Sequence, residues 1–502
     1  MAASLSRHAP PKASAMIESL RGLGYTTATA LADIIDNSIA ASADRIDITF
    51  IWLGTGSIIS ILDNGNGMTE IELDKGMRLG EINPLENRKS TDLGRFGLGL
   101  KTASFSQCRR LTVASRKNGE LSCLRWDLDI IATSMDDGWH LLEGAHEGAE
   151  KLLSPLNDYD TGSLVLWEVL DRIVTPGFGE QDFLDLIDRV EQHLAMVFHR
   201  LLEDNNRSGL NIYINNKSVS PWNPFFIGHP AKPWNSPEVR FPSADGVVME
   251  CHVLPHKDGL TESEFQSAAG PGGWTAQQGF YVYRNKRLLI AGTWLGLGQG
   301  RTWIKDEAHR LARIRLDIPN SADADWKIDI RKSVARPPVN LRPWLTRYAE
   351  DTRSRARRVF AHRGKPSTGI RGQPVVTAWK TEHFSGGVRY RIDPDHPAIR
   401  SVIEDAGNLL PQIKAMFRVI EETIPVQRIW IDTAENHETP QTNFNGEALE
   451  EVTRILDVMY RNLVLRKGVC PAHAREQLLG CEPFHNYPDL VAALPDYLPQ
   501  DK

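Results

Sequence analysis

The first half of the chain alternates between helical and strand-like spacing of its apolar residues. Apolar positions recur at helical intervals over 16–21 and 27–41. Isoleucine-rich, partly alternating stretches are typical of strands, and such stretches are found at 45–52, 57–62, 110–115 and 163–168. Because strand pairs follow one another between helices, the pattern predicts an α/β fold, more specifically an α+β two-layer sandwich with a mixed sheet.

A second α/β segment and a smaller module follow. The second segment is expected to open with a helix at 181–199, and its strands are expected at 210–214, 281–290 and 314–318. Residues 363–374 are rich in Gly, Pro and Ser and lack apolar periodicity, which predicts a linker. We therefore expect domains at 1–175 and 176–362, a linker at 363–374, and a small, mainly helical or mixed C-terminal domain at 375–502, with helices at 398–423 and 447–467.

Composition indicates an ordinary globular protein. The 502 residues are 41% hydrophobic and 24% charged, which suits two or three domains. A net charge of -6 does not mark a nucleic-acid binder, although an average can hide a local basic patch. The five cysteines are scattered rather than arranged as a disulfide framework, and no apolar run approaches a membrane span. We expect a cytoplasmic protein without a membrane segment.

The first candidate motif lies in the helix expected over 27–41. Asp33 and Asn37 are four residues apart and share one helical face. A carboxylate and an amide oxygen in that register suit a hydrated Mg²⁺, and the carboxylate can also accept a proton from an attacking water. Ordinary solvated polarity on a helix surface explains this motif equally well when it is taken alone.

Two glycine-containing motifs follow. Asp63 comes directly after an expected strand, where its carboxylate can accept a hydrogen bond from an exocyclic amine such as that of adenine. Gly65 and Gly67 allow close backbone approach, although a plain turn has the same chemistry. The third motif can cradle phosphate with backbone N–H groups ahead of a helix expected at 100–107, and it consists of Gly94, Gly97, Gly99 and Lys101.

Other phosphate-binding loops fit the third motif less well. A Walker A loop needs Lys immediately after the last glycine, where this chain has Leu100. A Rossmann fingerprint would lie next to the first strand.

Together, in this order and spacing, the three motifs resemble the N, G1 and G2 boxes of the GHKL superfamily, which has a Bergerat-type ATP-binding fold. Thr161–Ser163 resembles its later G3 element. The boxes are most similar to those of MORC-like and MutL-like ATPases, and a bacterial source is expected. The resemblance implies that Asn37 ligates Mg²⁺, that Asp63 binds the adenine amine and that Lys101 pairs with phosphate. It implies an ATP-binding set of Asn37, Asp63, Gly65, Gly67, Met68, Gly94, Gly97, Leu98, Gly99, Lys101 and Ser163.

The resemblance also implies the catalytic residues. Asp33 occupies the position where the family usually has a catalytic Glu, so its reach to water is shorter by one methylene. Residues 82–93 occupy the place of an ATP lid. The segments 280–288 and 326–333 resemble an S5-like transducer domain, whose lysine contacts the γ-phosphate. Lys332 is the first candidate and Lys327 the second, and a solvated lysine at a strand end is the alternative for each.

Two further signals stay open at this point. Cys470, His473, Cys481 and His485 have residue types that bind zinc, but the middle spacing is short for a finger. The basic stretch 353–358 could contact nucleic-acid phosphates or could be a solvated helix.

The expected function is an ATP-hydrolysing conformational switch. The resemblance implies an ATP-dependent homodimer that acts on DNA or a partner protein in DNA repair, restriction or phage defence. A nucleotide-binding scaffold with little turnover and a MutL-like mismatch-repair factor are the alternatives. A sensor histidine kinase is rejected, because His8 is the one histidine ahead of Asp33 and it lies in a Pro-rich segment.

Overall fold

The chain forms two compact units, Met1–Gly364 and Lys365–Lys502, and each is described by itself. The structure is a computed structural model. It describes residues 11–81, 99–136, 138–204, 209–231, 233–241, 246–320, 325–329, 332, 334–361, 376–384, 387–429, 449–482 and 484–496.

The first unit begins with an eight-stranded mixed sheet in the order β5-β4-β3-β6-β2-β1-β7-β8. β1 and β7 run parallel, and the other neighbours are antiparallel. The mixed α/β fold expected from the sequence is therefore confirmed. The strands are β1 (Arg45–Ile51), β2 (Ile58–Asp63), β3 (Arg110–Lys117), β4 (Glu120–Asp127), β5 (Leu142–Glu143), β6 (Gly162–Glu168), β7 (Asn211–Ile214) and β8 (Lys217–Ser218).

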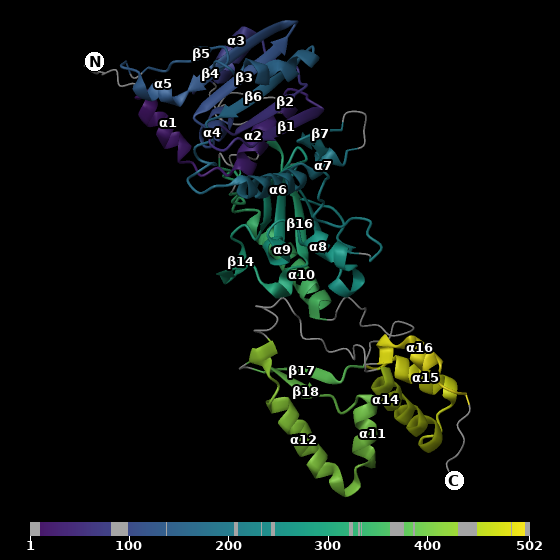
Figure 1. Ribbon diagram of the computed structural model, residues 1–502. Helices are drawn as coiled ribbons and strands as arrows, with labels where there is room; N and C mark the ends of the chain where they lie inside the picture. The colour runs from purple at the N-terminus through teal and green to yellow at the C-terminus, as the bar shows by residue number, and fades with distance from the viewer. Residues whose placement is uncertain are drawn as a thin grey trace, which may run out of the picture. The chain divides into compact units, whose positions relative to one another are not determined.

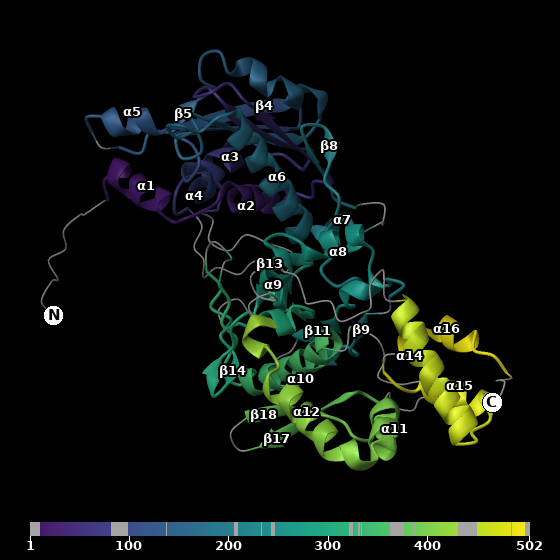
Figure 2. The same ribbon diagram turned by 60° about the horizontal axis from the view of Figure 1, so that its bottom comes forward.

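Strand alternation divides the side chains of this sheet between two apolar cores. In β2, Ile59 and Ile61 enter the larger core, whereas Ile58 and Leu62 enter a smaller core beneath the 3-10 segment η1 (Glu150–Asp158). The larger core is covered by helices, with α2 packed against both α4 and α6 (Figures 1 and 2). The helices of this part are α1 (Ala13–Arg21), α2 (Thr27–Ala40), α3 (Glu70–Met77), α4 (Gly99–Phe105), α5 (Leu128–Thr133), α6 (Glu180–Val197) and α7 (His199–Leu202).

The first sheet extends further along the chain than the expected domain 1–175. The sequence assigned the helix at 181–199 and the strand at 210–214 to the second domain. Instead, β7 pairs with β1, and Phe183 of α6 packs against Phe50 and Trp52 of the first sheet region. Periodicity identified both elements, but it carries no information about which strand β7 would join.

A second sheet follows in the order β10-β11-β16-β12-β13, with β9 paired to β11. The strand expected at 281–290 is instead a hairpin. Its turn residues Asn285 and Lys286 both have positive φ, 48° and 66°, as a tight two-residue turn requires. The strands are β9 (Trp234–Asn235), β10 (Val239–Arg240), β11 (Val248–Val253), β12 (Gly279–Arg284), β13 (Arg287–Thr293) and β16 (Ala312–Asp317), and a small separate hairpin is formed by β14 (Gly298–Gln299) and β15 (Arg301–Thr302).

The helices α8 (Glu262–Ala269), α9 (Gly273–Ala276) and α10 (Arg342–Ala361) accompany this sheet, and α10 packs on β11 and β16. The basic stretch 353–358 lies in α10 and is partly structural. The Arg353 guanidinium is buried, 4.6 Å from the ring centroid of Trp294 and 4.8 Å from that of Trp303. The sequence pattern could not distinguish this inward arginine from its exposed neighbours.

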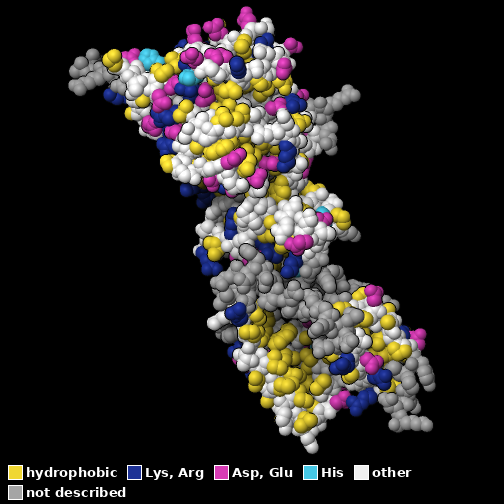
Figure 3. All heavy atoms as spheres, viewed as in Figure 1, with side chains coloured by type: hydrophobic (Ala, Val, Ile, Leu, Met, Phe, Trp, Pro, Cys, Tyr) yellow, Lys and Arg dark blue, Asp and Glu magenta, His cyan; other side chains and the backbone are white. Residues whose placement is uncertain are grey.

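The second unit combines a β-hairpin with helices. The long helix expected at 398–423 is interrupted after Asp405. Exposed apolar side chains of this unit, among them Val402, Leu409 and Val458, border a groove of about 630 Å³ (Figure 3). The elements are β17 (Trp379–Phe384), β18 (Gly387–Ile392), α11 (Pro397–Asp405), α12 (Leu410–Glu422), α14 (Leu449–Arg461), α15 (Pro471–Leu479) and α16 (Pro488–Ala492).

Membrane crossing has no support in the described part of the chain, because none of its helices is both long enough and apolar enough.

Gly67 is a position where the fold requires glycine. Its φ is +62°, and an added Cβ would lie 2.0 Å from the carbonyl oxygen of Arg116 in β3. Gly67→Ala should therefore lower the free energy of unfolding by about 3 kcal/mol, through backbone strain and a backbone clash together. Gly119→Ala is the matched control, because Gly119 has φ +81° and nothing within 4 Å. It should cost about 1 kcal/mol. Equal losses in urea denaturation of the two variants would contradict the assigned clash.

Candidate nucleotide-binding and catalytic site

Helix α2 carries the acidic half of the candidate site. A capping box formed by Thr26 and Thr29 fixes the start of the helix. One turn later, Asp33 and Asp36 are buried, with 6% and 2% of each residue exposed. Asn37, on the same face as Asp33, is exposed. The expected spacing of Asp33 and Asn37 therefore puts a buried carboxylate beside an accessible amide.

Two cations from the second sheet region, which is the second sheet with its helices and loops at 234–361, contact these carboxylates. Arg287, the first residue of β13, donates from Nε to Asp36 Oδ1 at 3.0 Å, and its Nη2 lies 3.7 Å from Asp33 Oδ1. Lys332 donates from Nζ to Asp33 Oδ1 at 2.9 Å and also to Asp36 Oδ2. We call Asp33, Asp36, Arg287 and Lys332 the ion cluster. It pairs two buried negative charges with two positive charges, as burial requires.

The surroundings of the ion cluster set its protonation. Burial alone would raise the pKa of Asp36, but the Arg287 and Lys332 charges outweigh it and hold that pKa below its ordinary value. The Tyr25 hydroxyl donates to Asp33 Oδ2 at 2.9 Å. Burial and the Asp33 charge raise the pKa of Tyr25, so this phenol stays protonated and remains a donor.

A strained loop presents Lys332. Its φ is +55°, a left-handed conformation that is uncommon for a lysine. Its backbone N–H donates to the Asp329 carbonyl at 3.0 Å, and the Val334 N–H donates to Asp329 Oδ1 at 2.9 Å. Lys327, the second sequence candidate, is exposed and forms no ion pair among the described residues. Of the two lysines, the structure brings Lys332 to Asp33.

A second polar corner forms at the end of β2. Ser38 donates to Asp63 Oδ2 at 2.8 Å, and the Gly65 N–H donates to Oδ1 at 2.9 Å. Burial raises the pKa of Asp63, and these hydrogen bonds partly oppose that shift. The β2–β6 register pairs Asp63 with Ser163. A buried acceptor beside two glycines suits recognition of an exocyclic amine.

Ser115 of β3 connects residues of this corner by hydrogen bonds. Its hydroxyl lies 2.8 Å from that of Ser163 and accepts from the Met68 N–H at 2.8 Å. The sequence analysis assigned a binding role to Met68 and Ser163 but none to Ser115 or Ser38. Ser38 directly follows Asn37 in the first motif, whereas Ser115 gave no signal apart from its position in a strand.

The phosphate-binding motif is described only in part. Gly99 opens α4, and Lys101 lies within that helix, 3% exposed, with Nζ donating to the Gly76 carbonyl at 2.8 Å. Burial lowers the pKa of Lys101 to about 8. Gly94, Gly97 and Leu98 lie outside the described residues, as does the lid segment 82–93.

Sequence reasoning named Lys332 but missed Tyr25, Asp36 and Arg287, which surround Asp33 and Lys332. Tyr25 lies just ahead of the first motif, Asp36 within it, and Arg287 within a segment noted only for its resemblance. No spacing rule connects Arg287 to Asp36, because they are 251 residues apart.

Zinc has no described site. Cys470 is exposed and Cys481 is buried, and across the described ranges no three His, Cys, Asp or Glu residues are placed to hold a metal ion.

Fold and motifs together define a GHKL-type ATPase domain in the N-terminal part of the chain. Residues 25–156 match the family described as histidine kinase-, DNA gyrase B- and HSP90-like ATPases. The matched region contains Asp33, Asn37, Asp63 and the glycine-rich motif before α4.

Among curated proteins, this chain is similar to MORC ATPases. It is 24% identical to ATPase MORC2B of Mus musculus over 206 residues, which are 38% of this chain and 19% of the mouse protein. It is 28% identical to ATPase morc-1 of Caenorhabditis elegans over 116 residues, 22% of this chain and 13% of the worm protein. The match therefore spans a fifth or less of the length of these relatives, and it supports a MORC-like GHKL domain.

The Arg287–Asp36 pair should contribute strongly to stability. Arg287→Met leaves a buried carboxylate with one fewer cation, which should cost about 3 kcal/mol. Arg287→Met/Asp36→Asn should lose clearly less than the sum of the two single variants in denaturant titrations. Lys286→Met, in the same hairpin, removes a half-exposed pair with Asp204 and should cost under about 1 kcal/mol. Additive single-variant losses would refute the coupling.

Lys101 should make stability depend on pH. Its folded pKa of about 8 lies below the ordinary 10.5, so between these values the unfolded chain binds more protons. The free energy of unfolding of the wild type, relative to Lys101→Met, should rise by about 3 kcal/mol as pH increases from 8 to 10.5. Urea titrations of both proteins across this range measure the difference. A constant difference would show that burial does not lower the pKa of Lys101 in the folded protein.

Proposed function

We propose that the chain is an ATP-hydrolysing conformational switch in which the second sheet region senses the γ-phosphate through Lys332. The observation that carries this proposal is the contact of Lys332 with Asp33 across the two sheet regions of one unit. Lys327 and Lys332 both have left-handed backbone conformations, with φ of 48° and 55°, so the contact with the buried Asp33 carboxylate is what favours Lys332 for this role.

The residues present suit ATP and Mg²⁺. Asp63 would accept from the adenine amine, the exposed Asn37 would offer its amide oxygen to Mg²⁺, and Lys101 would approach the phosphates from α4. ATP, when bound, supplies the γ-phosphoryl group that water attacks, and Mg²⁺ neutralises phosphate charge. Gly65, Gly67, Met68, Gly99 and Ser163 complete the proposed pocket among the described residues, and Gly94, Gly97 and Leu98 are proposed for it from the sequence motif alone.

Asp33 and Lys332 would share the catalytic work. Asp33 Oδ1 would accept the proton of the attacking water, with Tyr25 holding the other carboxylate oxygen in place. Lys332 would provide positive charge where negative charge develops. Because Lys332 also pairs with Asp33, its movement toward a phosphate would free Asp33 to act as a base. ATP binding and activation of the base would then be coupled through one side chain.

Dimerisation and the wider setting are further parts of the proposal. ATP would close the lid at 82–93 and bring two N-terminal domains together, and the C-terminal unit would engage DNA or a partner protein. The similarity to MORC ATPases supports the ATP-dependent part of this proposal. A DNA repair, restriction or phage-defence setting is proposed by family analogy alone.

A nucleotide-binding scaffold with little turnover is the second candidate. Asp33 is shorter than the usual Glu and is already held by both Tyr25 and Lys332. These two contacts would restrain Asp33 from reaching water. A MutL-like mismatch-repair role remains a further alternative.

The test compares the two lysine candidates. Lys332→Ala should lower kcat by roughly 10²- to 10³-fold while leaving ADP binding intact, because ADP lacks the γ-phosphate. Lys327→Ala is the matched control and should keep the wild-type rate. Specific ATPase activity should rise with protein concentration, and light scattering with a non-hydrolysable ATP analogue should show a dimer.

Each unexpected result would contradict a different part of the proposed function. Loss of activity in Lys327→Ala alone would exchange the two lysine roles. ATP binding without hydrolysis in the wild type would favour the scaffold. A monomer with analogue that hydrolyses ATP at a concentration-independent specific rate would refute the dimer switch.

A further inference from the structure

A cavity of about 740 Å³ adjoins the ion cluster on the side of the second sheet. Its walls come from β13 and the turn after it, from the loop that carries Lys332, and from the first residue of α10. Thr29 of α2 contributes from the first sheet region. The cavity therefore lies where the catalytic lysine meets the second sheet region.

The charged side chains that line this cavity are all positive among the described residues. Among the described residues that line it, four are cationic and none is an aspartate or glutamate. Lys332 is neutralised by Asp33 and Asp36. The remaining three are Lys305, Arg336 and Arg342.

These three cations have no carboxylate partner within the described ranges. Lys305 donates to the Ala276 carbonyl, and Arg342 donates to the Pro337 carbonyl at 3.1 Å. Neither contact compensates a charge. In the same sheet region, Arg315 is paired with Glu250 at 2.8 Å, whereas Arg313 donates only to carbonyl groups among the described residues, as Lys305 and Arg342 do. Three uncompensated positive charges around one cavity create a local potential that favours an anion.

Helix α10 adds to that potential. It spans 20 residues and begins at Arg342, so the positive end of its dipole lies at the cavity wall. Lys305 is exposed, and desolvation by the neighbouring groups still lowers its pKa. An anion would reverse that effect by stabilising the charged form.

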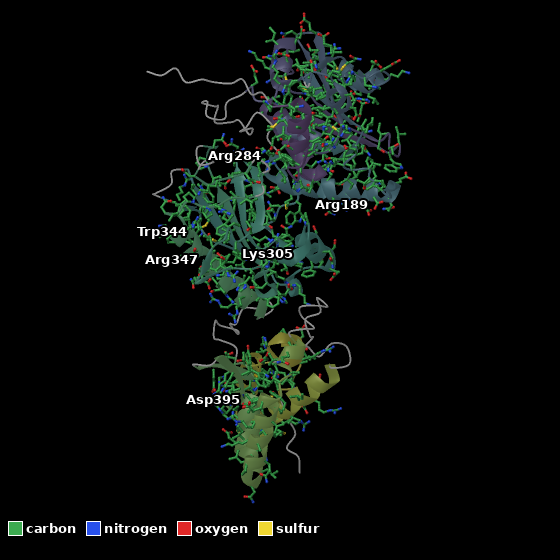
Figure 4. The ribbon with its side chains drawn as sticks, turned by 90° about the vertical axis from the view of Figure 1, so that its left-hand side faces the viewer. Arg189, Arg284, Lys305, Trp344, Arg347 and Asp395 are labelled. Atoms are coloured by element: carbon green, nitrogen blue, oxygen red, sulfur yellow. The ribbon has the colours of Figure 1, made fainter. Side chains whose placement is uncertain are left out.

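The cations form a path from the interior to the surface. The Lys332 side chain is 12% exposed, whereas Arg336 and Arg342 are exposed. Figure 4 labels Lys305 in the second sheet region. An anion that leaves Lys332 would therefore meet further positive charge before it reached solvent.

We propose that this cavity is the exit route for the inorganic phosphate that ATP hydrolysis releases. The inference rests on the proposed ATPase function. Hydrolysis forms one P–O bond to water and breaks the bond to the β-phosphate oxygen, so each turnover leaves one phosphate beside Lys332. Arg336 and Arg342 would then bind the departing phosphate, and Lys332 would return to Asp33. ADP would leave separately, from the proposed nucleotide pocket beside Asp63.

The first experiment measures phosphate binding without ATP. Inorganic phosphate is titrated calorimetrically into the full chain and into Arg336→Gln/Arg342→Gln. Because charge-assisted hydrogen bonds carry the proposed contacts, the double variant should bind roughly 10- to 100-fold more weakly. Arg347→Gln is the matched control, because Arg347 is exposed on the same helix (Figure 4) and does not line the cavity. Its affinity should equal that of the wild type.

The second experiment separates cleavage from release. In single-turnover reactions, acid quench measures ATP cleavage and a fluorescent phosphate sensor measures free phosphate. Phosphate should appear together with cleavage in the wild type and in Arg347→Gln. In the double variant, cleavage should keep its rate and phosphate release should lag behind it. Unchanged ATP affinity and circular dichroism would show that the double variant is folded.

Several outcomes would overturn the route. Equal phosphate affinity in the wild type and the double variant would show that the two arginines do not form a phosphate site. Binding of duplex DNA that needs both arginines, without binding of phosphate, would also refute the site. Phosphate that binds from solution, without delayed release in the double variant, would leave an anion site and refute an exit. Absence of cleavage in a wild type that still binds phosphate would instead refute the ATPase function, and the route with it.

Discussion

The ion cluster is the constraint on which the rest of the first unit depends. Asp33 and Asp36 are buried in the middle of α2, and both of their cations come from the second sheet region. Buried carboxylates are tolerated only when they are paired. The ion cluster therefore helps to fix the second sheet region relative to α2, together with the apolar cluster that joins Met196 of α6 to Tyr281 and Tyr283 and with the His199–Tyr283 hydrogen bond at 2.8 Å.

Within the cluster, the two cations differ in how they are held. Arg287 has a further fixed contact, a donation to the Leu288 carbonyl at 2.7 Å, and it begins a regular strand. Lys332 is carried by a short strained loop. The cluster thus combines a cation on a regular strand with a cation on a loop. Asn37 lies one turn beyond Asp33, so a change at Lys332 occurs beside the amide proposed to hold Mg²⁺.

The sequence predicted local features well and distant pairings poorly. Alternation located β1, β2, β3 and β6, because each strand divides its side chains between two cores. Four-residue spacing placed Asp33 and Asn37 on one face of α2. The partner of β7, the inward Arg353 and the Arg287–Asp36 contact depend on residues far along the chain, where local pattern has no influence. The catalytic and nucleotide-binding roles stay predictions.

The pairing of β7 with β1 has a consequence for where the N-terminal domain ends. The family match stops at residue 156. A fragment cut there would leave β1 as an open edge, with its N–H and C=O groups free to pair with another chain. It would also lose Phe183, uncovering the aromatic rings of Phe50 and Trp52. The boundary of sequence similarity is therefore not a boundary of structure, and a fragment keeps β1 enclosed only if it extends through Ile214, the last residue of β7.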